Sequence, residues 1–271
     1  MSIEVKKLKK FISLFIINYV CVFYFCPMES WLDIAVKAAR LAGEAIMEVY
    51  AQPFEVYTKD DASPVTQADL RASSIIKETL KPTGLPFVSE EDLPPDRSHY
   101  GRYWLVDPLD GTAEFVKRNG EFTVNIALIE NKRPVLGVIY APTLDKMWTS
   151  CDKHLLPFTS HLLPFTVLVS RSHRTQEVDD YIDKVLRPLH PDLVIDSQGS
   201  SLKFARLVEG TADVYVCYSK TKEWDTAAAD AILTAAGGKV LRINDGQTLE
   251  YDKEDYPNPP FVAYSAAAVP Y

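Results

Sequence analysis

Apolar positions in the first part of the chain follow two helical repeats. Through residues 31–50 they recur three or four residues apart, at Ile34, Ala38, Leu41, Ala45 and Val49. This spacing predicts an amphipathic helix, because residues three and four apart share one helix face. A second helix is predicted over residues 67–80, since Thr66 suits the first cap position and Pro82 ends the pattern.

Shorter apolar runs without a helical repeat predict β-strands further along. Residues 87–89 and 103–106 are largely apolar, and each run leads directly into acidic residues. Two longer runs, 123–129 and 135–140, are rich in β-branched residues and are joined by the polar segment 130–134. This arrangement is typical of a β-hairpin.

Predicted strands and helices alternate in the second half. Strands are expected at 166–169, 193–195, 213–216 and 239–243, and helices at 178–186, 201–208 and 226–236. Alternation of this kind predicts an α/β fold in which helix layers pack on sheets.

Composition is that of a soluble globular protein and argues against some partners. The chain has 271 residues, of which 47% are apolar and 24% charged, enough for a sizeable core. A net charge of −8 argues against a nucleic-acid polymer, which needs a basic surface. A small phosphorylated substrate stays open, because a bound cation can reverse the local charge. The four cysteines form no close metal-ligand pair and no dense disulfide pattern, so a cytoplasmic location is expected.

The first 27 residues differ from the rest of the chain. Four lysines within residues 6–10 precede an apolar run from Phe11 to Cys26. This run is short for a membrane span and lacks a small-residue cleavage site, so one interpretation is a peripheral anchor on the inner face of the cell membrane. The other is that translation starts at Met28 and the extension lies upstream of the natural start. Residues 28–271 are expected to form the functional domain in either case.

Four short stretches carry the candidate chemistry. Their sequences are VTQAD (65–69), SEED (89–92), DPLDGT (107–112) and WDTAA (224–228). In the second and third, carboxylates directly follow an apolar strand, where rigid scaffolds often place functional groups. Pro108 stiffens the turn and Gly111 permits a sharp bend, so two carboxylates and the Leu109 carbonyl are expected around one point.

Such an oxygen-rich cluster suits Mg²⁺, which shares its coordination shell with water and substrate phosphate. With Glu90 and Asp225 added, the carboxylates suffice for two or more ions, an arrangement that assists phosphoryl transfer. Plain structural explanations remain open for each stretch. Thr66 and Asp69 fit a capping box, Asp225 fits a helix cap, and the other residues fit turns or a solvated loop.

Taken in order, the four stretches resemble the signatures of the inositol monophosphatase superfamily. The resemblance covers about residue 28 to the C-terminus and implies that family's layered α/β/α/β/α sandwich. It also implies two or more Mg²⁺ ions held by Glu90, Asp107, the Leu109 carbonyl, Asp110 and Asp225. Thr112, paired with Asp69, would orient and deprotonate the nucleophilic water, and Glu90 counts with them as a catalytic residue. Inhibition by lithium is a further expectation from the resemblance.

Three other segments resemble the bacterial bisphosphate nucleotidase branch of this superfamily. They are KRNGEFTVNIAL (117–128), SRSH (170–173) and GSSLKF (199–204). By this resemblance, Ser200 and Lys203 contact a phosphorylated ribose, and a lysine near a helix N-terminus does favour a second phosphate. The implied substrate contacts are Asp110, Gly111, Thr112, His173, Ser200, Lys203 and Asp225.

The function implied by the resemblance is a Mg²⁺-dependent 3'(2'),5'-bisphosphate nucleotidase. It would hydrolyse adenosine 3',5'-bisphosphate to AMP and phosphate, with PAPS as a second substrate, and so serve sulfur metabolism. Two alternatives stay open. One is an inositol or sugar monophosphatase, for which the metal site is equally suited. The other is an inactive membrane-associated scaffold, suggested by the N-terminal extension.

Two departures from the branch pattern concern substrate affinity. Cys217 stands where an arginine is common, so one electrostatic contact with the nucleotide is either absent or supplied by Lys220 or Lys222. The connector 150–166 replaces what is usually a Gly-rich hairpin segment.

Overall fold

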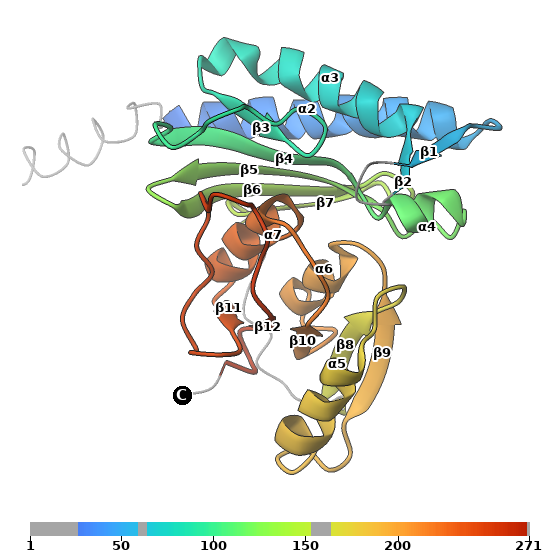
Figure 1. The fold of residues 1–271 in the computed structure, drawn as a ribbon, viewed down its shortest axis with the longest axis vertical. Coiled ribbons are helices and arrows are strands. Elements are labelled where there is room, and N and C mark those ends of the chain that lie inside the picture. The colour runs from blue at the N-terminus through green and yellow to red at the C-terminus, as the bar shows by residue number, and fades with distance from the viewer. Residues whose placement is uncertain (1–26, 59–63, 153–163, 270–271) are drawn as a thin grey trace, which may run out of the picture.

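The computed structural model describes residues 27–58, 64–152 and 164–269. They form five stacked layers in the order α/β/α/β/α (Figure 1). The layered α/β sandwich expected from the sequence is therefore confirmed.

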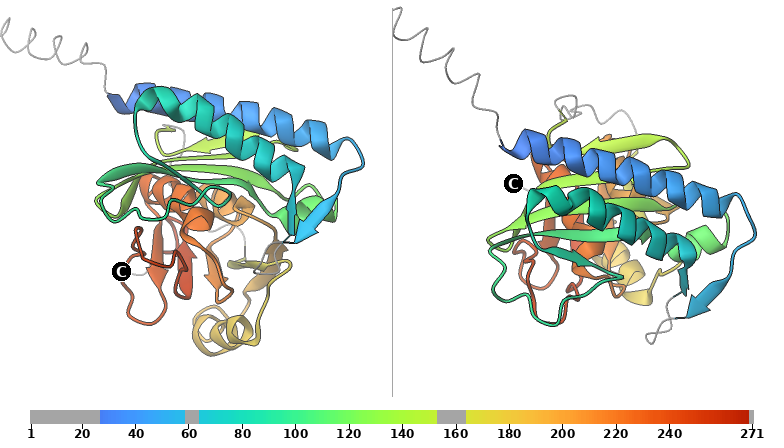
Figure 2. Two further views of the ribbon diagram at one scale, coloured as in Figure 1. Left: turned by 45° about the horizontal axis from the view of Figure 1, so that its top comes forward. Right: turned by 90° about the horizontal axis from the view of Figure 1, so that it is seen from above.

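The first two layers are a helix pair and a five-stranded sheet. Helices α2 (Pro27–Tyr50) and α3 (Gln67–Leu80) lie side by side across one face of this sheet (Figure 2). β3 pairs in parallel with β4, and the other neighbours are antiparallel. In spatial order the strands are β3 (Phe87–Ser89), β4 (Arg102–Asp110), β5 (Thr123–Glu130), β6 (Arg133–Ala141) and β7 (Lys146–Thr149).

The remaining layers are an inner helix layer, a second five-stranded sheet and an outer helix. Helices α6 (Leu202–Val208) and α7 (Glu223–Ala235) lie between the two sheets (Figure 1). Helix α5 (Gln176–Tyr181), continued by a π-turn at Ile182–Leu186, covers the outer face. In spatial order the strands are β11 (Lys239–Arg242), β12 (Phe261–Tyr264), β10 (Val214–Cys217), β8 (Thr166–Ser170) and β9 (Val194–Gln198).

Short elements complete the described part of the chain. Strands β1 (Val56–Thr58) and β2 (Pro64–Thr66) pair as a small ribbon that leads into α3. A 3₁₀ turn at Lys81–Thr83 follows α3, and α4 (Thr112–Val116) follows β4.

Three hydrophobic cores fill the spaces between the layers, and strand β4 contributes to two of them. Trp104 and Val106 pack in the core beneath α2 and α3, whereas Tyr103 and Leu105 pack in the core around α6 and α7. Successive side chains of a strand point to opposite faces, so β4 fixes both layers at once.

One local expectation was wrong: Asp107 and Asp110 do not follow the strand but belong to β4. Asp107 is opposite Asn125 and Asp110 is opposite Thr123, so β4 carries one more residue than β5 here and forms a bulge. Pro108 has no N–H to offer β5, and the Leu109 N–H instead donates to the Asp107 carboxylate at 3.0 Å.

The other predicted helices and strands agree with the structure within a few residues, and both α2 and α7 begin earlier than expected, at Pro27 and Glu223. Strands β1, β2, β7 and β12 and helix α4 were not predicted. The N-terminal extension and connector residues 153–163 lie outside the described residues, so the expectations for them stay predictions. In the part of the chain that is described, none of the helices combines the length and apolar character that crossing a membrane requires.

We expect Gly137→Ala to destabilise the contact between β6 and α7. A Cβ at Gly137 would lie 2.2 Å from the carbonyl oxygen of Ala228 in α7. Overpacking of this kind costs about 1–3 kcal/mol, which guanidinium unfolding would detect. Gly101→Ala is the control, because a Cβ there meets no atom within 4 Å. Equal unfolding midpoints for the two variants would contradict the packing of α7 against β6.

Candidate active site

A cavity of about 970 Å³ opens where the β4 bulge meets the N-terminal ends of α6 and α7. Its walls come from both halves of the molecule, the first sheet on one side and the second sheet with its connections on the other. Every predicted site residue lines this cavity except Asp69, which is buried and bonded to Thr112. The lining includes Glu90, Asp107, Leu109, Asp110, Gly111, Thr112, His173, Ser200, Lys203 and Asp225.

Asp69 uses its two carboxylate oxygens for two tasks. Oδ2 accepts hydrogen bonds from the Thr66 N–H and from Thr66 Oγ1, both at 2.7 Å, which completes the capping box at the start of α3. Oδ1 accepts a hydrogen bond from Thr112 Oγ1 at 3.0 Å. Burial raises the pKa of Asp69, and the hydrogen bonds from Thr66 and Thr112 partly offset this rise. The capping and catalytic interpretations are thus compatible.

Thr112 has a choice of two acceptors. Its Oγ1 lies 3.0 Å from Asp69 Oδ1 and 3.2 Å from the Leu109 carbonyl oxygen. A hydroxyl has a single proton to donate, so it serves one acceptor at a time. When Thr112 donates to Asp69, the Leu109 carbonyl oxygen is left to bind another group.

Asp110 is oriented by donors that the sequence did not reveal. Its Oδ2 accepts hydrogen bonds from Ser201 Oγ at 2.7 Å and from Asn125 Nδ2 at 3.1 Å, with Thr123 Oγ1 at 3.5 Å. Ser201 Oγ also lies 3.2 Å from the carbonyl oxygen of Asp225. Ser201 therefore connects the β4 bulge to the first turn of α7.

Asp225 lies in the first turn of α7, and its Oδ2 accepts a hydrogen bond from the Lys222 N–H at 2.8 Å. The expectation that Asp225 is the N-cap itself was wrong: the N-cap is Lys222, and Asp225 is the third residue of α7, whose carboxylate bonds back to the cap backbone. Burial raises the pKa of Asp225 well above its usual range, and the negative charges of Asp110 and Glu90 raise it further. The pKa of Asp107, which is 2% exposed, is also raised by burial and by the negative charges of Glu90, Asp110 and Asp225.

This donor set fits a divalent cation. Carboxylates and a carbonyl oxygen are the ligands that Mg²⁺ prefers. Their mutual repulsion marks a local excess of negative charge that a cation would offset. Within the described residues, no three acidic, histidine or cysteine side chains are already arranged as a coordination shell.

The turn before α6 presents Ser200 and Lys203 to the same cavity. Ser200 has a φ of 45°, a left-handed conformation that is rare outside glycine. Lys203 is only 6% exposed, and its Nζ donates to the Ser200 carbonyl at 2.6 Å. Burial lowers the pKa of Lys203, and the charge of Asp110 partly offsets this effect. Lys203 is thus a buried cation facing the cavity rather than a solvated helix residue.

Basic side chains line the outer part of the cavity. His173 is exposed and lies there with Arg174, Lys220 and Lys222. Arg174 is paired with Asp179, and Glu177 adds an acidic side chain to the same lining. Cys217 is 2% exposed, and its Sγ lies 3.3 Å from Ser219 Oγ. Both lysines expected to replace the missing arginine therefore line the cavity.

A cluster of ionic and polar contacts joins parts of the three segments that resemble the nucleotidase branch. Glu121 accepts hydrogen bonds from Arg171 Nε at 2.6 Å and from the Gly199 N–H at 2.7 Å. Ser172 Oγ donates to Glu114 at 2.5 Å. Residues 114–121, 170–173 and 199–201 are thereby held together beside the cavity.

Comparisons with known proteins agree with this geometry. The sequence model of the inositol monophosphatase family matches residues 27–268. The chain belongs to this family, as the four acidic stretches indicated. The match also agrees with the expected extent of the resemblance.

Individual relatives point to one branch of the family. The chain is 45% identical over 247 residues to the 3'(2'),5'-bisphosphate nucleotidase CysQ of Salmonella typhimurium, an alignment that covers 85% of this chain and 98% of the relative. The crystal structure of CysQ from Bacteroides thetaiotaomicron superposes with a TM-score of 0.79 at 37% identity, covering 90% of this chain and 98% of that one. A structure described as an IMPase/NADP phosphatase complexed with Mg²⁺ and phosphate shares the fold, with a TM-score of 0.68 at 17% identity and coverage of 84% and 87%.

We expect Asp107→Asn to stabilise the metal-free protein at neutral pH. The pKa of Asp107 is raised above its unfolded value of about 3.8, so the folded state binds the proton more tightly. Stability therefore falls as pH rises from about 4 towards the raised pKa. The asparagine removes this charge and can still accept the Leu109 N–H.

Thermal unfolding at about pH 5 to 8, with a chelator and then with Mg²⁺, would test this expectation. The variant should melt higher than wild type in the chelator at neutral pH and gain less from Mg²⁺. A variant that melts lower in the chelator and responds fully to Mg²⁺ would contradict it.

Proposed function

We propose that this chain is a Mg²⁺-dependent 3'(2'),5'-bisphosphate nucleotidase, a phosphoric monoester hydrolase. Its substrate is adenosine 3',5'-bisphosphate, which it converts to AMP and phosphate, and PAPS is a second substrate of the same kind. The observation that carries the proposal is that the carboxylate cluster and the Ser200–Lys203 turn face one cavity. The chain's 45% identity to the Salmonella enzyme named for this activity supports it.

The reaction needs a water oxygen to attack phosphorus while the bond from phosphorus to the ribose 3' oxygen breaks. Mg²⁺ bound by the proposed ligand set would offset the charge on the phosphoryl group and lower the pKa of water. The ligands proposed for it are Glu90, Asp107, the Leu109 carbonyl, Asp110 and Asp225.

Thr112 and Asp69 prepare the nucleophile. Because Thr112 Oγ1 donates to Asp69, its lone pairs remain available to accept a water proton. As the water proton moves to Thr112, the proton of Thr112 passes to Asp69. The raised pKa of Asp69 favours this transfer. The ribose oxygen leaves as an alkoxide and takes its proton from water.

The substrate's second phosphate distinguishes this proposal from the inositol or sugar monophosphatase alternative. Lys203 supplies a buried positive charge at the start of α6, and Ser200 lies beside it. Lys220 and Lys222 add positive charge at the rim. A nucleoside bisphosphate has one phosphate for the metal site and a second phosphate for these basic groups. A monophosphate ester has a phosphate for the metal site only. The inactive scaffold is disfavoured, because it has no use for a buried carboxylate cluster.

Phosphate release should be fast from adenosine 3',5'-bisphosphate and slow from inositol 1-phosphate when both are assayed with Mg²⁺. Added Li⁺ should inhibit the reaction. Turnover of the inositol ester alone would retain the metal site and overturn the assignment of Ser200 and Lys203. No turnover of either substrate would overturn the proposed activity.

Asp110→Asn should lower kcat by orders of magnitude while leaving the fold intact. The amide keeps the size of the side chain but removes one ligand charge from the cluster, and steps that depend on charge neutralisation are sensitive to such a loss. Steady-state kinetics with circular dichroism as the folding control measures this effect. Near-normal turnover would refute the metal assignment of Asp110.

A further inference from the structure

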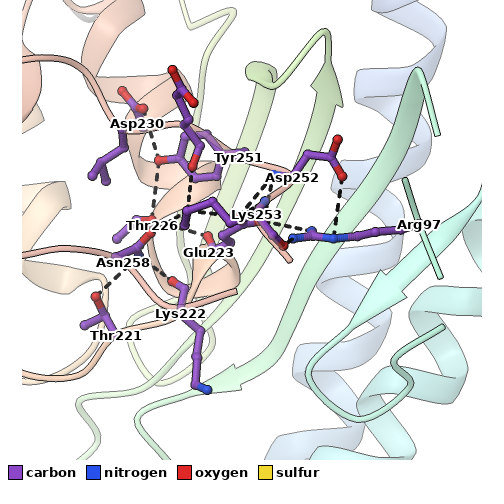
Figure 3. Close-up of polar contacts among 12 residues, drawn as sticks. Arg97, Thr221, Lys222, Glu223, Thr226, Asp230, Tyr251, Asp252, Lys253 and Asn258 are labelled. Atoms are coloured by element: carbon purple, nitrogen blue, oxygen red, sulfur yellow. Dashed lines mark hydrogen bonds and ion pairs between the residues drawn. The ribbon is translucent and has the colours of Figure 1, made fainter. Parts of the chain in front are cut away.

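A buried ionic cluster lies beside the proposed metal site and takes no part in the chemistry described above. Its centre is Glu223, the first residue of α7, whose side chain is 0% exposed (Figure 3). Glu223 accepts hydrogen bonds from Arg97 at 2.8 Å and from the backbone N–H groups of Asp252 at 3.0 Å and Lys253 at 2.8 Å. The Lys253 ammonium lies 2.9 Å from the same carboxylate.

Arg97 is nearly as deeply buried, at 6% exposed. Its guanidinium also donates to Tyr103 Oη at 3.2 Å and to the Lys253 carbonyl oxygen, and it stacks 3.9 Å from the centre of the Tyr256 ring. Tyr256 in turn packs on Trp224, the neighbour of Glu223. The rigid fork of the guanidinium allows one side chain to hold several acceptors at fixed angles.

The cluster joins two parts of the chain that carry proposed metal ligands. Arg97 lies on the connection between Glu90 at the end of β3 and Asp107 in β4. Glu223 stands two residues before Asp225 in the first turn of α7. The pair therefore bridges two segments that are 126 residues apart in sequence and that each carry proposed metal ligands.

A contact of this kind is better suited to fixing geometry than to adding net stability. Desolvation of two charges offsets much of their attraction, so a buried ion pair contributes little free energy over a well-packed apolar pair. Several directional bonds on each partner nevertheless leave few alternative positions for the backbone that carries them.

We propose that Arg97 and Glu223 are positioning residues that hold the first turn of α7 against the β3–β4 connection, so that Asp225 stays beside Glu90 and Asp107 for cation binding. The inference rests on the proposed metal site. It assigns to the pair no contact with substrate.

The test compares Mg²⁺ binding to three variants of the full chain. Arg97→Met removes the charge and the fork but retains much of the apolar volume. Arg97→Lys retains the charge but reaches fewer of the acceptors. Arg102→Met is the matched control. Arg102, at the start of β4, also pairs with a glutamate, Glu130, but its side chain is about 39% exposed.

Isothermal titration calorimetry of the metal-free proteins with Mg²⁺ gives the binding constants directly. Loss of supporting contacts around ligands typically weakens metal affinity by about 10- to 100-fold, which is the expected effect of Arg97→Met. Arg97→Lys should show a smaller loss and Arg102→Met none. The KM for the nucleotide at saturating Mg²⁺ should be unchanged in Arg97→Met, a result that a general loss of structure would not give.

An Arg97→Met protein that binds Mg²⁺ as tightly as wild type overturns the positioning role. If that variant does not fold by circular dichroism, Arg97→Lys decides in its place: weaker Mg²⁺ binding than wild type supports the role, and equal binding overturns it. A wild-type protein that fails to bind Mg²⁺ would instead refute the metal site on which the proposed function rests, so the two failures are distinct.

Discussion

Repulsion among buried carboxylates is the constraint on which the rest of the site depends. Burial raises the pKa of Asp107 and that of Asp225, and the negative charges of Glu90 and Asp110 raise both further. Left to relax, such groups would move apart or take up protons. The surrounding structure keeps these groups close together by fixing each carboxylate through its backbone, with a strand bulge for Asp107 and Asp110 and a capped helix turn for Asp225. A bound cation would offset this repulsion, which otherwise destabilises the metal-free protein.

Strand β4 transmits this arrangement through the molecule. Its alternating side chains belong to the cores on both faces of the first sheet, so the strand has little freedom to shift in either direction. Gly137 on β6 lets α7 approach the first sheet closely. As a result α7, which carries Asp225, packs against the sheet to which β4 and Asp107 belong. The geometry of the cavity is therefore a property of the layered packing as a whole and not of one loop.

Local sequence signals predicted much of the fold and most of the acidic side chains in the cavity. Thr66 and Asp69 predicted the start of α3 correctly, because a capping box is formed by residues close together in sequence. Long-range contacts could not be found in this way. The continuation of β4 through Pro108 depends on pairing with β5, Ser201 meets Asp110 only in the folded chain, and Arg97 meets Glu223 across 126 residues. The burial of Lys203 is a further example. Its sequence position suggests an exposed helix residue, but α6 lies between the two sheets and the side chain is buried.

Asp69 has a consequence for how related sequences are compared. One carboxyl group begins helix α3 and also receives the hydrogen bond from Thr112. Selection for a well-formed helix would preserve this aspartate in a descendant that had lost its chemistry. Its retention is therefore a weak sign that a homologue is active. The Thr112 hydroxyl plays no such part in starting α3, so under the proposed mechanism its replacement by a residue without a hydroxyl is the more informative mark of a pseudoenzyme.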